Sequence, residues 1–545
     1  MRRMRLAAAL FAVAIAAVFV TTAMAHHRPP AGFKSLQAAM LDCPTCKSVT
    51  PIITVGETLP GSTFRFESIP DGISIVPGKR GGDDDDDDGA RTAEILVNHE
   101  TSTVPFPLTP VVLNDFDNSQ LSRITLNTRT AGVLSGFFAI PSSANYQRFC
   151  SNFMATKEHG FSRPLLFTNE EATDFVNRTG TAFPGTPGVQ EQAGVVVAYD
   201  PRNGQYRSIY GMGRHNHENS VALPGYKRPV ILSGDDTFVP PSSQLYMYLA
   251  KNADEVWNDQ GALWAFTSDN PLINDYGDLS GNASVSGTFI PVPRDIAVGE
   301  QAGLETWSND NNVFQFIRLE DIAYDRKNPN VVYVADTGEP RALPGTPRLV
   351  RGPSGTIGPY SNGRIFKFVF DKKNPKSVKS LSILIDGDAR GAAGVGALDL
   401  IHQPDNLETT KGFLYIQEDP GGHNQYAIGD PNGTPARIHE YDLRRNTIRT
   451  LATVNQGADE GPTDVDPSTT PARWGAWESS GIVDASSILG KGAFLVDIQA
   501  PTLVVEREVQ ATQTLEREGG QLLLIRVGKG GGHHHDDDDD DDDDD

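Results

Sequence analysis

The stretch GMGRHNHENSVALPGYKRPVILSGDD, residues 211–236, holds the pattern around which the rest of the sequence is organised. An apolar strand at 229–233 separates two groups of metal-binding residue types, which are His215, His217, Glu218, Asp235 and Asp236. Carboxylates near strand ends can point to a common centre, where calcium binds several oxygens at once, and imidazole suits iron or zinc. Each residue alone has a plainer explanation, such as capping a turn, but the clustering favours a metal site.

Outside this stretch, short apolar runs bounded by Gly, Pro, Asn or Asp dominate, and helical periodicity is scarce. Such runs are typical of many short strands. Several of them end in acidic residues, as in LLFTNEE, ILSGDD, VVYVADT and LYIQED. In a β-propeller the innermost strand of each blade lines a central channel, so each blade can place a side chain at the axis. The sequence therefore predicts an all-β fold, and a β-propeller explains the repeated acids better than a sandwich does.

The net charge of the chain limits the kinds of binding partner that we expect. The chain of 545 residues carries a formal charge of −23, but aspartate runs at 83–88 and 536–545 supply sixteen of the negative charges. The remaining −7 describes a mildly acidic protein. This argues against nucleic acid or an anionic membrane as a partner, because both select basic surfaces. We expect a small-molecule ligand and a monomer, with the aspartate runs as solvated segments.

The N-terminus has the form of a secretory signal peptide. Arg2, Arg3 and Arg5 precede an apolar run at 6–20, and the AMA motif ending at Ala25 is a small-x-small cleavage site. The sequence predicts cleavage after Ala25 and a periplasmic or secreted protein. No later stretch is apolar over enough residues to span a bilayer, so we expect no membrane insertion.

Composition also divides the chain. Residues 26–92, rich in Pro, Gly and Ser, are predicted to form an N-terminal arm with an acidic insert, and residues 93–527 to form the propeller. The polar stretch 454–473 is predicted to be a long loop. Residues 528–545, with their His and Asp runs, are predicted to be a disordered tail.

The chain contains three cysteines, Cys43, Cys46 and Cys150. The CPTC pair is predicted to form a local disulfide in an oxidising compartment. A redox motif is less favoured because no βαβ pattern surrounds the pair, and a zinc half-site lacks its second pair. Cys150 is either a buried small hydrophobe or a functional ligand.

With these residues described, the stretch GRHNHENSV followed by a strand and GDD resembles the signature of the PhoX family of bacterial alkaline phosphatases. Further motifs follow in the same order over most of residues 90–527, namely NHE, FCS, LFTNEE, FIRLEDIAYD, VYVADTG, GRIFKF, QPDNL, LYIQED and FLVDIQAPT. The resemblance implies a secreted, six-bladed β-propeller that holds calcium and iron in a central phosphate-binding site.

The resemblance also implies roles for individual residues. The implied metal ligands are Glu100, Glu171, Glu218, Glu320, Asp405 and Glu418. Arg318 and Glu320 are the implied catalytic residues, and Arg318 with Asn406 would bind the phosphoester substrate. Hydrolysis of a phosphomonoester requires neutralisation of charge on the phosphoryl oxygens, which an arginine fork and metal ions supply. The alternative for Arg318 is an ordinary ion pair with Glu320 or Asp321.

One position departs from the family pattern. Asn169 stands where the family's CEE motif has a cysteine, which in the resemblance would hold iron. Asn is not a soft anionic donor, so the sequence favours calcium over iron. Cys150, nineteen residues upstream, is a competing thiol if its side chain reaches the channel.

Two other functions fit the same predicted fold. One is a secreted, calcium-stabilised propeller that binds a ligand without catalysis, since propellers carry many unrelated functions. The other is a different propeller hydrolase, phytase-like or lactonase-like. The sequence contains no Gly-x-Ser-x-Gly elbow with a plausible triad, which weighs against a serine esterase.

Overall fold

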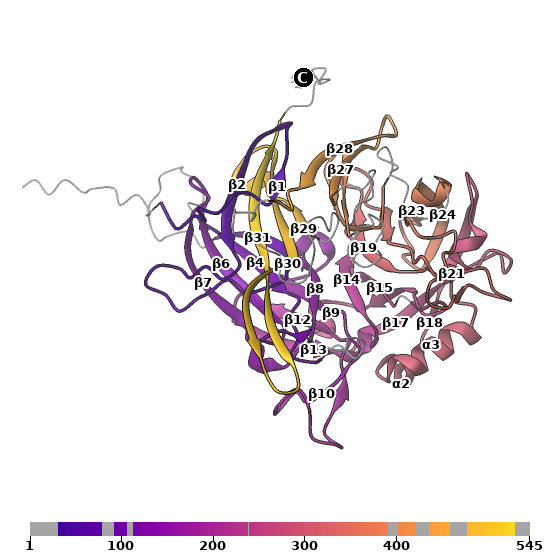
Figure 1. Ribbon diagram of the computed structural model, residues 1–545. Helices are drawn as coiled ribbons and strands as arrows, with labels where there is room; N and C mark the ends of the chain where they lie inside the picture. The colour runs from indigo at the N-terminus through magenta and orange to yellow at the C-terminus, as the bar shows by residue number, and fades with distance from the viewer. Residues whose placement is uncertain are drawn as a thin grey trace, which may run out of the picture.

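The computed structural model describes residues 31–78, 92–105, 113–237, 239–390, 401–419, 435–457 and 477–528. The predicted signal peptide, both aspartate runs, nearly all of the predicted tail and most of the predicted 454–473 loop lie outside the described residues. Within them the chain is built from β-strands (Figure 1), and the helices are few and short. None of the described helices has the length and apolar character needed to cross a membrane.

Two four-stranded antiparallel sheets come first along the chain. The first has the strands β3 (Pro70–Pro77), β4 (Thr92–His99), β6 (Gln120–Asn127) and β7 (Val133–Ile140). The second has the strands β8 (Phe149–Ala155), β9 (Leu165–Glu170), β12 (Val196–Asp200) and β13 (Gln205–Ile209). In both sheets the strand order follows the chain, as expected for strands joined by short turns.

The middle of the chain forms a nine-stranded sheet. Its first half contains β14 (His217–Ala222), β15 (Val230–Asp235), β16 (Leu245–Leu249) and β17 (Ala262–Ser268). Its second half contains β19 (Leu319–Tyr324), β20 (Val331–Asp336), β23 (Arg364–Phe370) and β24 (Ser377–Asp386). Strand β18 (Ser284–Pro291) pairs with β17 and β24 and so joins the halves. An aromatic core that includes Phe266, Phe316 and Phe368 fills the space between them.

Two further sheets contain strands from both ends of the chain. One has β25 (Pro404–Thr409), β26 (Phe413–Glu418), β27 (Arg437–Asp442), β28 (Thr447–Val454) and β1 (Leu41–Asp42). The other has β29 (Glu478–Asp484), β30 (Ala493–Val509), β31 (Thr514–Val527) and β2 (Cys46–Thr54), with β5 (Leu113–Asn114) beside β31. Figure 1 shows the indigo N-terminal strands lying against the yellow C-terminal ones.

Short additions complete the structure. Two small hairpins are formed by β10 (Phe175–Val176) with β11 (Glu191–Gln192) and by β21 (Ala342–Leu343) with β22 (Val350–Arg351). The helices are α1 (Ala253–Trp257), α2 (Arg294–Ala297), α3 (Gln301–Asp310) and α4 (Ser486–Leu489).

Six inner strands contact one another in the order β3, β8, β14, β19, β25 and β29, and β29 contacts β3. Of these, β14 and β19 are the two end strands of the nine-stranded sheet. This closed ring around an axis is the arrangement of a β-propeller, which confirms the predicted fold class. The number of blades stays a prediction, because β18 fuses two of the units into one continuous sheet.

The prediction of an N-terminal arm ending at residue 92 is wrong. Strand β1 pairs with β28, β2 pairs with β31, and β3 is a member of the inner ring. The proposed boundary at residue 93 separates β3 from β4, although the two strands form one hairpin. Composition misled the prediction, because Pro and Gly in this segment do not keep it out of the sheets: Pro51 lies within β2, and Pro70 and Gly72 lie within β3.

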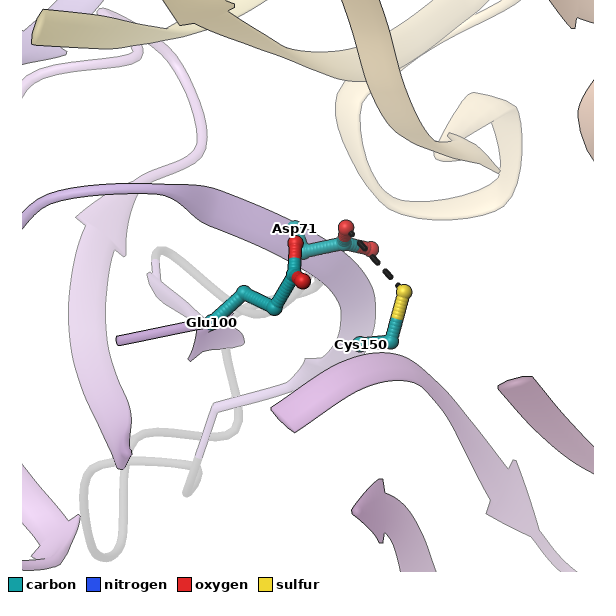
Figure 2. A group of neighbouring side chains, drawn as sticks. All are labelled: Asp71, Glu100 and Cys150. Atoms are coloured by element: carbon teal, nitrogen blue, oxygen red, sulfur yellow. Dashed lines mark hydrogen bonds between the residues drawn. The ribbon is translucent and has the colours of Figure 1, made fainter. Parts of the chain in front are cut away.

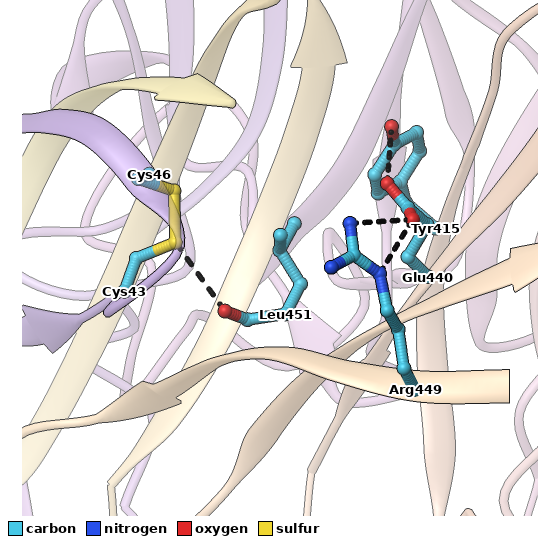
Figure 3. The surroundings of a disulfide bond; sticks show 6 residues. All are labelled: Cys43, Cys46, Tyr415, Glu440, Arg449 and Leu451. Atoms are coloured by element: carbon cyan, nitrogen blue, oxygen red, sulfur yellow. Dashed lines mark hydrogen bonds and ion pairs between the residues drawn. A yellow bond between two sulfur atoms is a disulfide. The ribbon is translucent and has the colours of Figure 1, made fainter. Parts of the chain in front are cut away.

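The predicted disulfide between Cys43 and Cys46 is confirmed, with an S–S distance of 2.01 Å (Figure 3). It lies between β1 and β2, and Cys43 Sγ is 3.3 Å from the carbonyl oxygen of Leu451 on β28. The link therefore stands where the chain passes from one C-terminal sheet to the next.

One irregularity recurs in every hairpin of the inner ring. The register between its first two strands shifts after an initial pair, as between Pro70↔His99 and Ile73↔Val97. The corresponding pairs are Phe149↔Glu170, His217↔Asp235, Leu319↔Asp336 and Pro404↔Glu418. In the last hairpin the equivalent pair is Ser479↔Ile498, which lies between Glu478↔Gln499 and Ser480↔Asp497, and the shift follows the latter. A β-bulge bends a strand and re-aims the side chains within it. The repeated bulge therefore presents the same positions of each hairpin toward the axis.

These positions can be named by their place in the hairpin. In each hairpin, the axial positions are the residues that directly follow the paired residue of each strand. On the first strands they are Asp71, Cys150, Glu218, Glu320, Asp405 and Ser480. The residues that follow the paired residues of the second strands are Glu100, Glu171, Asp236, Thr337, Asp419 and Gln499. The supporting positions are the paired residues of the second strands, His99, Glu170, Asp235, Asp336, Glu418 and Ile498. The leading positions precede the first paired residue and are Ile69, Arg148, Asn216, Arg318, Gln403 and Glu478.

Candidate metal centre

Side chains at axial positions, together with Glu478 from a leading position, come together into one chain of candidate ligands. Four groups of three residues have one ligand atom each within 4.8 Å of one another: Asp71, Glu100 and Cys150; Cys150, Glu171 and Glu218; Glu218, Glu320 and Asp405; Asp405, Asp419 and Glu478. Each group shares a residue with the next. The inner ends of separate hairpins thus form a continuous acidic centre around a single thiol.

The first group shows how the neighbouring strands hold these side chains (Figure 2). Asp71 Oδ2 accepts hydrogen bonds from Ser480 Oγ at 2.7 Å, Gln499 Nε2 at 2.9 Å and Cys150 Sγ at 3.4 Å. Gln499 Nε2 is also 3.4 Å from Glu100 Oε2. The axial residues of β29 and β30 are therefore neutral donors that orient the acids of the adjacent hairpin.

Burial makes this set of acids electrostatically unfavourable by itself. It raises the pKa of Glu218, Glu320 and Asp405 well above the usual carboxyl range, and neighbouring carboxylates raise it further. Burial together with the nearby Asp71 raises the pKa of Glu100 to about 8. Buried carboxylates that repel one another need compensating cations, because isolated charge is costly to desolvate.

The donor set fits metal ions. Asp405 Oδ1 is buried and has no hydrogen-bond partner in the described part of the chain, so a carboxylate oxygen remains for a cation. The two groups that share Asp405 offer only oxygen atoms as ligands, which suits calcium. The two groups that share Cys150 add a soft sulfur donor, which suits a transition metal.

Five of the six predicted metal ligands lie in this centre, namely Glu100, Glu171, Glu218, Glu320 and Asp405. Their convergence was expected, and their role as ligands stays a prediction. Each occupies an axial position, directly after the paired residue of its strand.

The sixth predicted ligand, Glu418, is not in any of the four groups, and its interpretation as a ligand has to be corrected. Its carboxylate accepts hydrogen bonds from Arg437 Nε at 2.8 Å, Arg437 Nη2 at 2.7 Å and the His402 amide at 2.8 Å, and His439 Nε2 is 2.9 Å away. Burial alone would raise the pKa of Glu418, but the charges of Arg437 and His439 hold it well below its usual range. Its neighbour Asp419 is the residue that reaches the centre.

Sequence reasoning also left out Asp71 and did not select Asp419 or Glu478. Asp71 lay in the predicted arm, yet IPDG at 69–72 repeats the QPDN motif at 403–406 that contains Asp405. That internal repeat was a signal that could have identified Asp71. For Asp419, the signal is the position of the acid, since Glu170–Glu171 also ends the second strand of its hairpin and its second residue is the axial one.

The cluster quoted from residues 211–236 separates into two parts. Glu218 and Asp236 occupy axial positions. His217 is buried, with Nδ1 2.7 Å from Ser233 Oγ and Nε2 3.1 Å from the Gly213 carbonyl oxygen. His215 packs against His217 with ring centroids 3.6 Å apart and lies 3.7 Å from Asp235. His215, His217 and Asp235 lie away from the axial positions, and of the whole cluster only Glu218 is in the four groups. The alternation of side chains along the strands therefore divides a cluster that looked continuous in sequence.

The argument against iron rested on Asn169, and the structure removes its basis. Asn169 is buried and its Nδ2 donates a hydrogen bond to the Ser151 carbonyl oxygen at 2.7 Å, while its Oδ1 has no hydrogen-bond partner in the described part of the chain. Cys150 is in two of the four groups. The thiol that the sequence offered as a competitor is therefore among the candidate ligands, so the lack of a cysteine at position 169 does not exclude a sulfur donor.

Arg318 stands at the leading position of its hairpin and is largely buried. Its Nε and Nη2 donate to the two oxygens of Asp236 at 2.9 and 2.6 Å, and Nη2 lies 3.1 Å from Glu320 Oε1. The partner Asp236 was not anticipated. Asp336 fixes the backbone of this segment, accepting from the amides of Ile317 at 2.9 Å and Arg318 at 3.2 Å.

Asn406, the other predicted substrate-binding residue, links inner strands. Its Nδ2 donates to Ser151 Oγ on β8 at 3.0 Å, and its Oδ1 accepts from Ser480 Oγ at 3.2 Å and the Gly481 amide at 3.3 Å. Ser151 Oγ in turn donates to Glu218 at 3.0 Å. Both ends of the amide thus form hydrogen bonds within the protein, and the role of Asn406 in substrate binding stays a prediction.

Comparison with known proteins gives a structural likeness without a sequence match. No protein-family model matches the chain, and no curated protein matches it. Among solved structures, Pseudomonas fluorescens PhoX in complex with vanadate, a transition state analogue, has 17% sequence identity and a TM-score of 0.57. The alignment covers 91% of this chain and 98% of that one. NanB sialidase from Streptococcus pneumoniae follows with 6% identity, 85% and 69% coverage and a TM-score of 0.38, which is too low to indicate a shared fold. The resemblance stated from the sequence is therefore confirmed at the level of the fold: this chain is a PhoX-like β-propeller.

Proposed function

We propose that the protein is a metal-dependent hydrolase of phosphate esters, acting on phosphomonoesters outside the cytoplasm. The observation that carries this proposal is the convergence of acids from separate hairpins around Cys150, with the Arg318 guanidinium held at their edge. The solved protein with the same fold was crystallised with vanadate as a transition state analogue, which supports phosphoryl chemistry in such a site.

The residues present divide the metal sites by chemistry. Glu218, Glu320, Asp405 and the nearby acids would hold calcium, and the groups that share Cys150 would hold iron or another transition metal. Bound cations would neutralise phosphoryl oxygens and activate a water molecule as nucleophile.

The protein's own contribution is orientation. Asp236 holds the Arg318 guanidinium by both oxygens, so the side chain is fixed before substrate arrives. A planar guanidinium matches a pair of phosphoryl oxygens, and a positioned donor costs little reorganisation during the reaction. Ser151 and Asn406 brace Glu218 from the neighbouring strands.

Metal removal and restoration test the proposal. Purified protein is treated with a chelator, and calcium, iron or both are returned while p-nitrophenyl phosphate hydrolysis and metal content are measured. We expect hydrolysis to disappear with the metals and to return with them. Full metal loading without hydrolysis of any phosphomonoester would contradict the proposal and favour the ligand-binding propeller. Preferential hydrolysis of phytate or a lactone would favour the other propeller hydrolases.

Arg318→Lys tests the geometric part, with Arg445→Lys as matched control. Lysine keeps the charge but loses the fork, so kcat should fall by about tenfold or more while metal content stays unchanged. Arg445 is exposed in the β27–β28 turn, and its substitution should leave kcat unchanged. Parental activity in Arg318→Lys would reduce Arg318 to an ion-pair partner of Asp236.

A further inference from the structure

A cavity of about 250 Å³ opens at one edge of the nine-stranded sheet, and its lining includes Leu249 of β16 and Ala262 of β17. Leu249 pairs with Ala262 on one side and with Val230, the first residue of β15, on the other. The last residue of β15 is Asp235, which occupies a supporting position beside the axis. The cavity and the candidate metal centre therefore lie at opposite ends of this ladder, separated by about 17 Å of strand.

Cations dominate the charged lining of this cavity. Arg228, Lys251 and Lys376 line it together with one acid, Glu255. Glu255 is already neutralised by Lys251, because its Oε1 lies 3.0 Å from Lys251 Nζ and its Oε2 accepts from the Lys251 amide at 2.9 Å. The side chains of Arg228 and Lys376 form no ion pair with any of the described residues. Two positive charges thus remain uncompensated here, in a chain whose overall charge is negative.

The rest of the lining combines an apolar surface with an amide. Leu249, Ala250 and Trp264 contribute the apolar atoms. Lys376 Nζ lies 4.2 Å from the centre of the Trp264 ring, and this cation–π contact holds the ammonium group beside the apolar surface. Gln260 is exposed and adds an amide, which can both donate to and accept from hydroxyl groups.

These features together match an acidic sugar. A carboxylate accepts strong, charge-assisted hydrogen bonds from guanidinium and ammonium groups. The C–H face of a sugar ring suits the apolar lining, and its hydroxyl groups suit the Gln260 amide. A neutral sugar would leave Arg228 and Lys376 without a counter-charge, whereas an aromatic acid would leave Gln260 without a partner.

We propose that this cavity is a binding site for a uronic acid, either free or as a unit of an anionic polysaccharide, whose carboxylate is bound by Arg228 and Lys376. The site shares no residue with the four groups of the candidate metal centre, so it does not depend on the proposed function.

Isothermal titration calorimetry on the full-length, metal-loaded protein tests the inference, with D-galacturonate, neutral D-galactose and benzoate as probes. We expect galacturonate to bind more tightly than the other two. Arg228→Gln and Lys376→Gln should each weaken galacturonate binding by about tenfold, because each removes one charge-assisted contact. Unchanged affinity in both variants, no binding of galacturonate to the parent, or tighter binding of benzoate would overturn the inference.

Lys227→Gln and Lys373→Gln are matched controls. Both lysines are exposed, lie in the same two segments as Arg228 and Lys376, and do not line the cavity. Loss of such a surface charge should change galacturonate affinity by less than about twofold. Equal weakening by all four substitutions would indicate a diffuse effect of charge and would overturn the assignment to the cavity.

Two further measurements identify the source of the ligand and separate this inference from the proposed function. Retention of the parent on immobilised polygalacturonate, lost in Arg228→Gln, would show that the site accepts the polymer; calorimetric binding of galacturonate without retention would restrict it to the free acid. Hydrolysis of p-nitrophenyl phosphate should be the same in the parent, Arg228→Gln and Lys376→Gln. If the parent hydrolyses no phosphoester, the proposed function fails while the binding test still decides the inference.

Discussion

Glu418 and Asp419 are adjacent in sequence, both acidic and both at the end of β26, yet they belong to different regions of the molecule. Glu418 points into its sheet and is neutralised by Arg437 and His439. Asp419 reaches the axis, where its neighbours are other acids. Glu170 and Glu171 differ in the same way, because Glu170 forms two 2.7 Å hydrogen bonds with Arg178. Glu418 and Glu170 thus have arginine counter-charges within the protein, whereas the axial acids of the four groups converge on one another and fit external cations.

The largest effect on folding is expected at the supporting position. Glu418→Gln leaves Arg437, whose side chain is 4% exposed, buried without its counter-charge. Removing one partner of a buried pair costs about 3–5 kcal/mol, so the free energy of unfolding in urea should fall by that amount. Asp419→Asn is the matched control: it should lower metal content and leave the stability of the metal-free protein nearly unchanged. Equal destabilisation by both variants would break the comparison.

Removal of bound metal should lower the free energy of unfolding only through the residues of the candidate metal centre. A ligand at 100 to 1,000 times its dissociation constant stabilises the folded state by about 3–4 kcal/mol, so chelation should lower the parental stability by a similar amount. In Asp405→Asn this loss should shrink, because a carboxylate shared by two groups is missing. Calorimetric unfolding with and without calcium measures it. An undiminished response in Asp405→Asn would place the stabilising metal elsewhere.

A buried histidine outside both regions gives a pH dependence that the metal does not influence. Burial lowers the pKa of His159 from 6.5 to about 4, and its Nε2 lies 3.1 Å from the Tyr324 hydroxyl. Between these values the unfolded chain binds a proton that the folded protein does not, so stability falls as pH falls from 6.5 to 4 and levels off below. The contribution is about 3 kcal/mol.

His159→Gln should remove that part of the pH dependence. Urea unfolding of parent and variant at pH 7 and pH 4.5, both after chelation, measures the difference. Parallel pH profiles for the two proteins would show that His159 is not the titrating group.

The smallest effect on stability is expected for removal of the Cys43–Cys46 disulfide, which involves neither the supporting nor the axial acids. A disulfide that closes so short a loop restricts the unfolded chain little, and its removal costs about 2 kcal/mol. The Cys43→Ser, Cys46→Ser double variant should unfold at a slightly lower urea concentration with unchanged metal content. A change in metal content would show that the β1–β2 connection influences the axis.

Much of this architecture could be predicted from local sequence. Short apolar runs bounded by Gly, Pro, Asn or Asp indicated the strands, and acids at their ends indicated an axis. The CPTC spacing was sufficient for the disulfide. What local sequence could not provide was the choice between neighbouring acids, because alternate residues of a strand face opposite directions and a bulge changes which of them faces the axis. Glu418 was chosen over Asp419 for this reason.

Long-range pairing explains the remaining errors. Asp71 is bound by Ser480 and Gln499, more than four hundred residues later in the chain, so its neighbours in sequence did not show which residues surround it. The N-terminal segment similarly joins β28 and β31, which no composition could reveal.

The sequence by itself determined the strands, their acidic ends and the presence of a thiol at Cys150, since short apolar runs and residue chemistry are local properties. Only the tertiary structure decided that Cys150 lies among the acids, that Arg437 neutralises Glu418, and that Arg318 pairs with Asp236. The reason is physical: ring closure and the repeated bulge set the direction of each side chain, and both depend on contacts between hairpins far apart in sequence.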